Sequence, residues 1–352
     1  MLTERIYVMH ESEPTLLHPQ LDYRAEVLDR VSHSPTETTR WGARIHSELV
    51  TLQGTDGRQV IRELTIAEPS ARQEVVSPYS IVETDPWTTG ERGFNRDKIR
   101  SYTKLGYSVL WLHHGGRHSP VAKDKSVSRG AHQMHAVLDD LTLHNGLSTN
   151  EVIVAGYSRG GMTADKFIAL GSVYNRSTVF SNTEAPCFAR DMTAKEKVTT
   201  LARQTPGEII GIGKVAAKLV LRAIEENDPW LLAEYVQTLD VHPRNLIQEA
   251  LWAHALINAS VGYSTDSMPK DTIGIRNLFT KDYMSQLSEY RSRYAAFPNL
   301  RVREWNGPHL YGATPEYQRV KNNDFKQLLI AMQQNNMSLS GVRIDDVLVP
   351  AA

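Results

Sequence analysis

The stretch that decides the fold is EVIVAGYSRGGM, residues 151–162. An apolar run at 152–155 predicts a short buried strand, and the residues from Arg159 onward predict a helix. Between them lies GYSRG, residues 156–160. Glycines on both sides of a serine are typical of a sharp, strained turn from a strand to a helix, which lifts the hydroxyl above the carboxyl end of the strand. Ser158 is therefore the candidate nucleophile.

Strands and helices alternate on both sides of this turn, which predicts an α/β fold with a mostly parallel sheet covered by helices on both faces. A hairpin comes first, at 46–69, where two alternating runs flank an Asp56-Gly57 turn. The elements predicted after it are, in order, strand 77–84, helix 94–106, strand 107–114, helix 129–144, strand 151–158, helix 159–171, strand 176–184, strand 256–266, helix 283–295, strand 299–305 and helix 315–333.

The strand pattern is interrupted between residues 190 and 257, where helix signals dominate. Thr205-Pro206-Gly207-Glu208 is a capping box with proline at the first helical position. The domains expected are an N-terminal extension at 1–45, which has helical spacing at 19–31, an α/β core at 46–189 and 258–335, a helical cap insertion at 190–257, and a tail at 336–352.

Composition narrows the classes of function. The formal net charge is −1, which gives no reason to expect nucleic acid or an anionic membrane as a partner. The single cysteine, Cys187, excludes an intramolecular disulfide, and the N-terminus has no apolar segment of the kind found in secretory signals. We therefore expect a soluble, cytoplasmic protein whose partner is a small-molecule substrate.

A serine hydroxyl needs a base to become a nucleophile, and histidine is the usual choice. Three histidines follow Ser158: His242 and His254 lie in the helical insertion, and His309 lies in NGPH at 306–309. His309 comes directly after the predicted strand 299–305, so it leaves the sheet at its carboxyl edge. His309 is the candidate base.

Residues 47–333 resemble the α/β-hydrolase superfamily. The initial hairpin, the GYSRGG turn, the helical insertion after the sixth strand and the late NGPH loop occur in that family's order. The resemblance implies the α/β-hydrolase fold and a Ser-His-acid mechanism without a metal or an organic cofactor, and it does not identify a substrate.

The resemblance also suggests where the acid lies. The stretch LINASVGYSTD, residues 256–266, resembles the family's seventh strand, whose following loop carries the aspartate, so Asp266 is the first choice. Glu184 is the alternative acid, because some relatives carry it after the sixth strand. Asp271 comes third.

The histidines at 113 and 114 suggest two interpretations, an oxyanion motif and a metal site. His113-His114-Gly115-Gly116 looks like an oxyanion motif that follows the third strand in some lipases and esterases. Too few elements separate it from Ser158 for that placement, so it is assigned to the fourth strand. A metal site built on these histidines is not expected, because no carboxylate or cysteine accompanies them at a recognised spacing.

The third strand is then 77–84, and DPWT at 85–88 is the oxyanion loop. Pro86 has no N–H, so Trp87 or Thr88 would supply one donor, and the backbone N–H of Arg159 the other. The Arg159 side chain has two interpretations: it favours substrates that carry a carboxylate, or it pairs on the helix surface.

The sequence therefore predicts a serine hydrolase, with a carboxylic ester as the first choice of substrate. Amide, thioester and carbon–carbon bond hydrolysis use the same three residues and stay open. A non-catalytic binding protein on the same fold is the alternative from another class.

Overall fold

The structure is a computed structural model that describes residues 23–84, 93–113, 127–184, 268–280, 287–307, 314–339 and 342–348. In chain order the elements are β1 (Ala25–Ser32), β2 (Glu37–Thr38), β3 (Arg44–Gly54), β4 (Gln59–Glu68), β5 (Ser80–Thr84), α1 (Gly93–Lys104), β6 (Val109–His113), α2 (Val127–Asn145), β7 (Glu151–Tyr157), α3 (Arg159–Ala169), the 3-10 helix η1 (Gly171–Tyr174), β8 (Ser177–Glu184), β9 (Gly274–Phe279), α7 (Leu287–Ala295), β10 (Leu300–Trp305), α8 (Pro315–Gln334) and α9 (Ile344–Val347).

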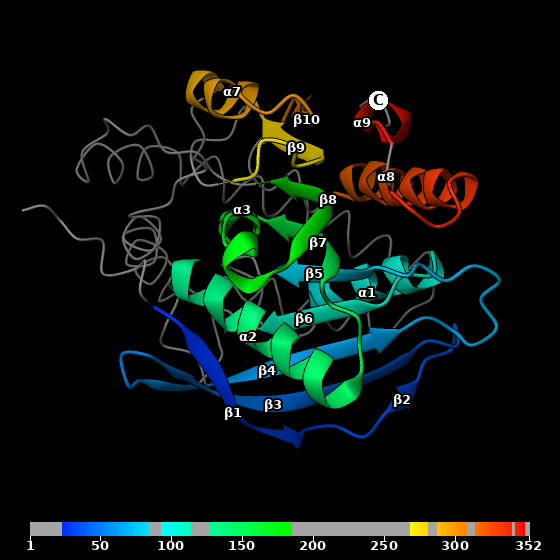
Figure 1. Ribbon diagram of the computed structural model, residues 1–352. Coiled ribbons are helices and arrows are strands. Elements are labelled where there is room, and N and C mark those ends of the chain that lie inside the picture. The colour runs from blue at the N-terminus through cyan, green and yellow to red at the C-terminus, as the bar shows by residue number, and fades with distance from the viewer. Residues whose placement is uncertain are drawn as a thin grey trace, which may run out of the picture.

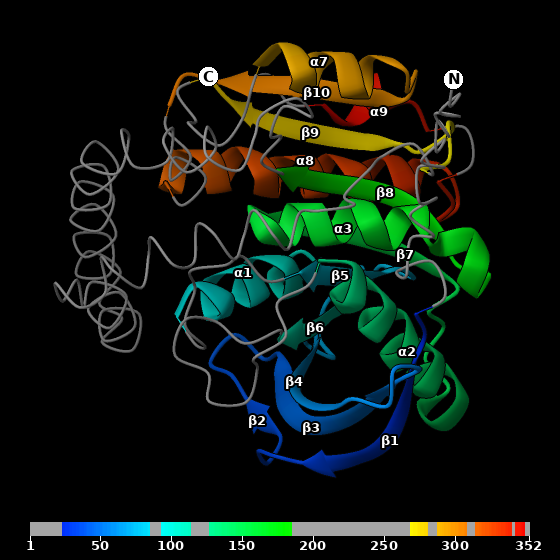
Figure 2. The same ribbon diagram turned by 90° about the vertical axis from the view of Figure 1, so that its left-hand side faces the viewer.

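The strands of the described residues form a single sheet in the order β1-β3-β4-β6-β5-β7-β8-β9-β10, with β2 beside β3. The strands from β6 to β10 in this order run parallel. The strands β1, β2, β3 and β4 pair antiparallel with one another, and β4 joins them to the parallel strands by pairing antiparallel with β6. Figure 2 shows the strands stacked from β1 at the bottom to β10 at the top. The predicted mostly parallel sheet is confirmed.

Helices cover both faces of this sheet (Figure 1). Along β7, Val152 and Val154 pack into the apolar cluster shared with α2 and α3, whereas Ile153 and Ala155 pack into the cluster shared with α1 and α8. Both faces of the strand are therefore buried, which explains why 152–155 is a continuous apolar run and not an alternating one.

The order of the strands reverses at β5. The chain passes from β5 through α1 to β6 on one side, and returns through α2 to β7 on the other side of β5. Ligands of open α/β sheets bind outside the carboxyl ends of the strands at such a switch point. Here the two carboxyl ends are Thr84 and Tyr157. The assignment of 77–84 to the strand beside the nucleophile strand, and of 107–114 to the next strand out, is confirmed.

The N-terminal part differs from its prediction. The helical spacing at 19–31 was wrong for the described residues, because Ala25–Ser32 is strand β1, paired with β3. Leu28 and Val31 are exposed on this edge strand, and so the apolar residues that suggested a helix are not the ones that the strand buries. With β2, this part of the expected extension at 1–45 extends the sheet.

The hairpin at 46–69 is confirmed as β3 and β4, with Gly57 at φ 75° in the connecting turn. The helix predicted to end at Gly106 is α1, and Gly106 follows it at φ 94°.

The strand next to β8 corrects another expectation. We expected 256–266 to follow the sixth strand in the sheet, but β9 (Gly274–Phe279) occupies that place, parallel to β8. The expectation that 256–266 is the strand beside β8 was therefore wrong. Residues 256–266 themselves lie outside the described residues. The cap at 190–257 also lies outside them. Within the described part of the chain, no helix is long and apolar enough to cross a membrane.

Candidate active site

Ser158 occupies a strained turn between β7 and α3. Its φ is 58° and its ψ −127°, and it is the residue that immediately precedes the helix. A non-glycine residue held in such a conformation costs roughly 1–3 kcal/mol and persists only where its surroundings enforce it. The strand-turn-helix context predicted for GYSRG is therefore present, with the serine itself at the strained position.

Gly156 shows why the turn needs glycine. A Cβ on Gly156 would lie 2.4 Å from Thr84 Oγ1 and 2.7 Å from the Gly160 carbonyl oxygen, closer than real Cβ contacts come. The end of β7, the end of β5 and the first turn of α3 therefore meet at Gly156 with no room for a side chain.

Thr84 connects the same three segments. Its hydroxyl lies 2.6 Å from the Gly160 carbonyl and 3.1 Å from the Ala155 carbonyl, and it is fully buried. The hydroxyl is the only donor in this contact, so it is shared between the two carbonyls. Thr84 fixes the strand that precedes the expected oxyanion loop against the helix that carries Ser158.

Glu184, the last residue of β8, also contacts the turn. Its Oε2 accepts a hydrogen bond from the Ser158 backbone N–H at 2.9 Å, and its side chain is buried. A carboxylate here also complements the positive end of α3. Ser158 and Glu184 are thus two predicted site residues that the sheet brings together.

Charged side chains line the α1 and α8 face of the sheet beneath this site. Glu83 on β5 is fully buried and accepts hydrogen bonds from Lys98 Nζ at 2.6 Å and from the Tyr102 hydroxyl at 3.0 Å. Burial, and then the negative charge of Glu83, raise the pKa of Tyr102. Glu83 lies directly before the expected oxyanion loop, and α1 follows that loop. The contacts of Glu83 therefore hold the two flanks of the loop together.

Helix α8 adds two more buried polar side chains, Tyr317 and Lys321. Burial, and next the charge of Glu184, raise the pKa of Tyr317 well above its usual value. Burial lowers the pKa of Lys321 to about 8, although Glu83 acts in the opposite direction. No sequence pattern marked these residues, because a lysine and a tyrosine one helical turn apart are common on exposed helix faces.

The remaining predicted site residues divide into two groups. His309, Asp266 and Trp87 lie outside the described residues. Arg159 is described and is only 1% exposed, so the interpretation that it pairs on the helix surface was wrong. Asp271 was also wrong as an acid: it is exposed and precedes β9, at the opposite edge of the parallel sheet from Ser158.

His113, at the end of β6, is occupied by protein groups. Its Nε2 lies 2.8 Å from the Thr65 hydroxyl, and its ring stacks on Trp111. Among the described residues, no cluster of histidine, cysteine and carboxylate side chains has the arrangement of a metal site.

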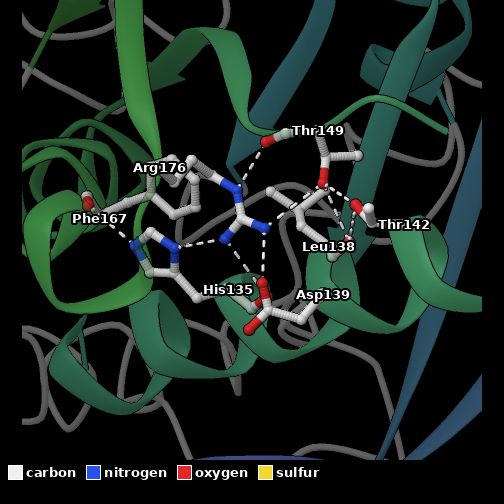
Figure 3. A network of polar contacts seen from close by, with 7 residues as sticks. All are labelled: His135, Leu138, Asp139, Thr142, Thr149, Phe167 and Arg176. Carbon is white, nitrogen blue, oxygen red and sulfur yellow. Dashed lines mark hydrogen bonds and ion pairs between the residues drawn. The ribbon is translucent and has the colours of Figure 1, made fainter.

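A second buried polar network lies at the opposite, amino edge of the sheet (Figure 3). His135 is stacked between Phe167 and Tyr174, at 3.9 and 4.2 Å between ring centroids. Arg176 donates to His135 Nδ1 at 2.7 Å, and His135 Nε2 lies 3.0 Å from the Phe167 carbonyl. These partners fit a neutral imidazole that is protonated on Nε2. The network secures α2 to β8 far from the carboxyl ends, so it is structural.

Comparison with solved structures gives the same architecture. Candida antarctica lipase A matches with a TM-score of 0.53 and 15% identity, over 93% of this chain and 85% of the lipase. Its closed state matches with a TM-score of 0.52 and 16% identity over the same shares. The rice cell wall degrading esterase LipA from Xanthomonas oryzae matches with a TM-score of 0.50 and 12% identity, over 92% of this chain and 99% of LipA.

The chain has the α/β-hydrolase fold. Its expected resemblance to that superfamily is confirmed in the strand order and in the likeness to these lipase and esterase structures. No protein-family model matches the chain, and no curated protein matches it. In this sheet β7 is the strand that ends at the Ser158 turn, and β8 and β9 are the next two strands outward.

Proposed function

We propose that this protein is a serine hydrolase that cleaves carboxylic esters of small molecules through an acyl-enzyme. The observation that carries the proposal is Ser158 itself, held at φ 58° between β7 and α3 at the switch point of the sheet. A binding domain has no need of a strained serine at this position, whereas a nucleophile has. The lipases and esterases of like fold support the ester as the first choice of bond.

The oxyanion would be stabilised by backbone donors. Arg159 is the first residue of α3, and the first N–H groups of a helix have no partner within the helix. In this proposal the Arg159 N–H, in the first turn of α3, donates to the negative charge that develops next to Ser158. The residues after Thr84, Trp87 among them, supply the second donor in this proposal.

His309 is the proposed base, because it follows a parallel strand and so leaves the sheet at the carboxyl edge on which Ser158 lies. The strand β10 ends at Trp305, three strands from β7, a separation of about 14 Å. The chain turns directly after β10, where the Gly307 N–H donates to the Trp305 carbonyl at 2.9 Å.

The position of β9 changes the choice of the triad acid. Asp266 was chosen because 256–266 was expected beside β8, and β9 holds that place. The loop that follows β9 begins after Phe279, where the sequence continues Thr280-Lys281-Asp282. Because β9 lies between β8 and β10, a carboxylate after β9 starts between the serine and the histidine strands. We propose Asp282 as the triad acid, ahead of Asp266.

Glu184 is a weaker candidate for the same role. Its carboxylate receives the backbone N–H of Ser158 itself, whereas a triad acid holds the imidazole nitrogen that points away from the serine. In the proposed mechanism His309 takes the proton from Ser158 and later gives it to the leaving alcohol, and Asp282 holds the imidazole.

The cap proposed at 190–257 would form part of the acyl pocket. Substitutions there should change the preference for acyl chain length more than the chemical step. Comparing p-nitrophenyl acetate, butyrate and octanoate on cap variants measures this preference.

Steady-state turnover of p-nitrophenyl esters tests the proposed function. The wild-type protein should hydrolyse the acetate or butyrate, and Ser158→Ala should lose activity by several orders of magnitude. Asp282→Asn and Asp266→Asn form a matched pair: only the former should approach the loss seen in His309→Ala. An equal rate in wild type and Ser158→Ala would refute the proposal.

A further inference from the structure

Glu184 and Ser158 share a contact that a triad does not require. The carboxylate accepts the N–H of the residue that carries the strained φ of 58°. Glu184 pairs with Tyr157 in the register of β8 and β7, so the carboxylate comes from the strand directly beside the turn. Its position is fixed by the sheet, and the contact restrains the backbone of Ser158.

We propose that Glu184 is a positioning residue, whose carboxylate holds the Ser158 N–H and thereby the turn that carries the proposed nucleophile. The inference rests on the proposed function only for the meaning of the reaction rates. The contact itself is a property of the backbone amide of Ser158.

A carboxylate, an amide and an apolar side chain differ as acceptors. A charged carboxylate makes a shorter and stronger hydrogen bond to an N–H than a neutral acceptor does. Glu184→Gln should therefore weaken the hydrogen bond to the Ser158 N–H, and Glu184→Leu should remove it.

The first test reads the Ser158 amide directly in the full-length protein. Serine is labelled with ¹⁵N, and the Ser158 signal is identified by its loss in Ser158→Ala. The amide proton should resonate downfield in wild type, move upfield in Glu184→Gln, and move further in Glu184→Leu. A Ser158 amide shift that is the same in all three proteins would contradict the proposed hydrogen bond to Glu184.

The second test separates a positioning role of Glu184 from the role of triad acid. The rate of labelling by a fluorophosphonate should fall by at most about tenfold in Glu184→Gln, because the side-chain carbonyl still accepts the Ser158 N–H. It should fall at least tenfold further in Glu184→Leu. A loss of roughly 10⁴-fold in Glu184→Gln is the result for a triad acid and contradicts the proposal. A wild-type protein that fails to react with the fluorophosphonate refutes the proposed function. The amide test then decides by itself whether Glu184 holds the Ser158 N–H.

Discussion

The hydroxyl of Thr84, at the end of β5, lies 2.6 Å from the carbonyl oxygen of Gly160, in the first turn of α3. The two residues are 76 positions apart in sequence, yet this contact joins the strand before the expected oxyanion loop to the helix after the nucleophile. The spacing between the two proposed oxyanion donors, one on each segment, therefore depends on Thr84.

Replacement of Thr84 by valine should test this dependence. Valine keeps the shape of the side chain and removes the donor, so two buried carbonyls lose a partner and the protein should lose about 1–3 kcal/mol of stability. We expect kcat on p-nitrophenyl butyrate to fall about tenfold or more, with KM changed less. Thr84→Ser is the matched control and should retain most of the activity. Equal kcat values in Thr84→Val and wild type would contradict the role of this contact.

The sequence predicted the sheet well because both faces of its strands are buried. Continuous apolar runs such as 152–155 stand out from the helices that flank them, and the glycines at 156 and 160 mark the close approach that the structure shows at Gly156. The strand at 25–32 was missed because it lies at an edge. An edge strand buries few side chains, so its apolar residues carry no period of two, and Leu28 and Val31 remain exposed.

The site was only partly predictable. Ser158 follows β7 and Glu184 ends β8, two strands that the sequence identifies, so their meeting at one edge could be inferred. The place of β9 could not, because nothing in the residues distinguishes 256–266 from 274–279 as the strand beside β8. Thr84 and Glu83 were missed, since each makes its contacts with partners that are distant in sequence.

The buried ion pair of Arg276 and Asp165 should contribute strongly to stability. Arg276 on β9 lies 2.9 Å from Asp165 on α3, both side chains are fully buried, and the Tyr294 hydroxyl also donates to Asp165. Asp165→Asn leaves the guanidinium without its counter-charge, so it should lower the free energy of unfolding by about 3–5 kcal/mol.

The exposed pair of Arg291 and Glu304 is the control for that change. These side chains are 55% and 37% exposed and lie 2.6 Å apart, so Glu304→Gln should cost about 0–1 kcal/mol. Urea unfolding of both variants measures the two values. Equal costs would show that the Arg276–Asp165 pair is not held in the buried geometry described.

Stability should fall in mildly acidic solution because of two buried histidines on α2. Burial, and then the charge of Lys166, lower the pKa of His132 to about 4, and burial, and then Arg176, lower that of His135. The unfolded chain binds protons at these residues below about pH 6.5, while the folded protein does not. The free energy of unfolding should therefore be constant above this pH and decrease as the pH falls from about 6.5 toward 4.

Urea midpoints measured at pH 7.5 and pH 5 would reveal this decrease, and His132→Gln should make it smaller. Glutamine replaces the imidazole near the Tyr174 hydroxyl, which lies 2.7 Å from His132 Nδ1 in wild type, and does not titrate. A decrease of the same size in His132→Gln and wild type would mean that other groups cause it.

The central claim is that Ser158 is the nucleophile of a hydrolase, and covalent trapping tests it most directly. Purified wild-type protein and Ser158→Ala would be treated with a fluorophosphonate, digested, and mapped by mass spectrometry. The account predicts one phosphonylated serine, Ser158, in the wild-type protein, and no adduct on Ser158→Ala. An adduct on another residue that persists in Ser158→Ala, or no adduct on the wild-type protein at saturating probe, would contradict it.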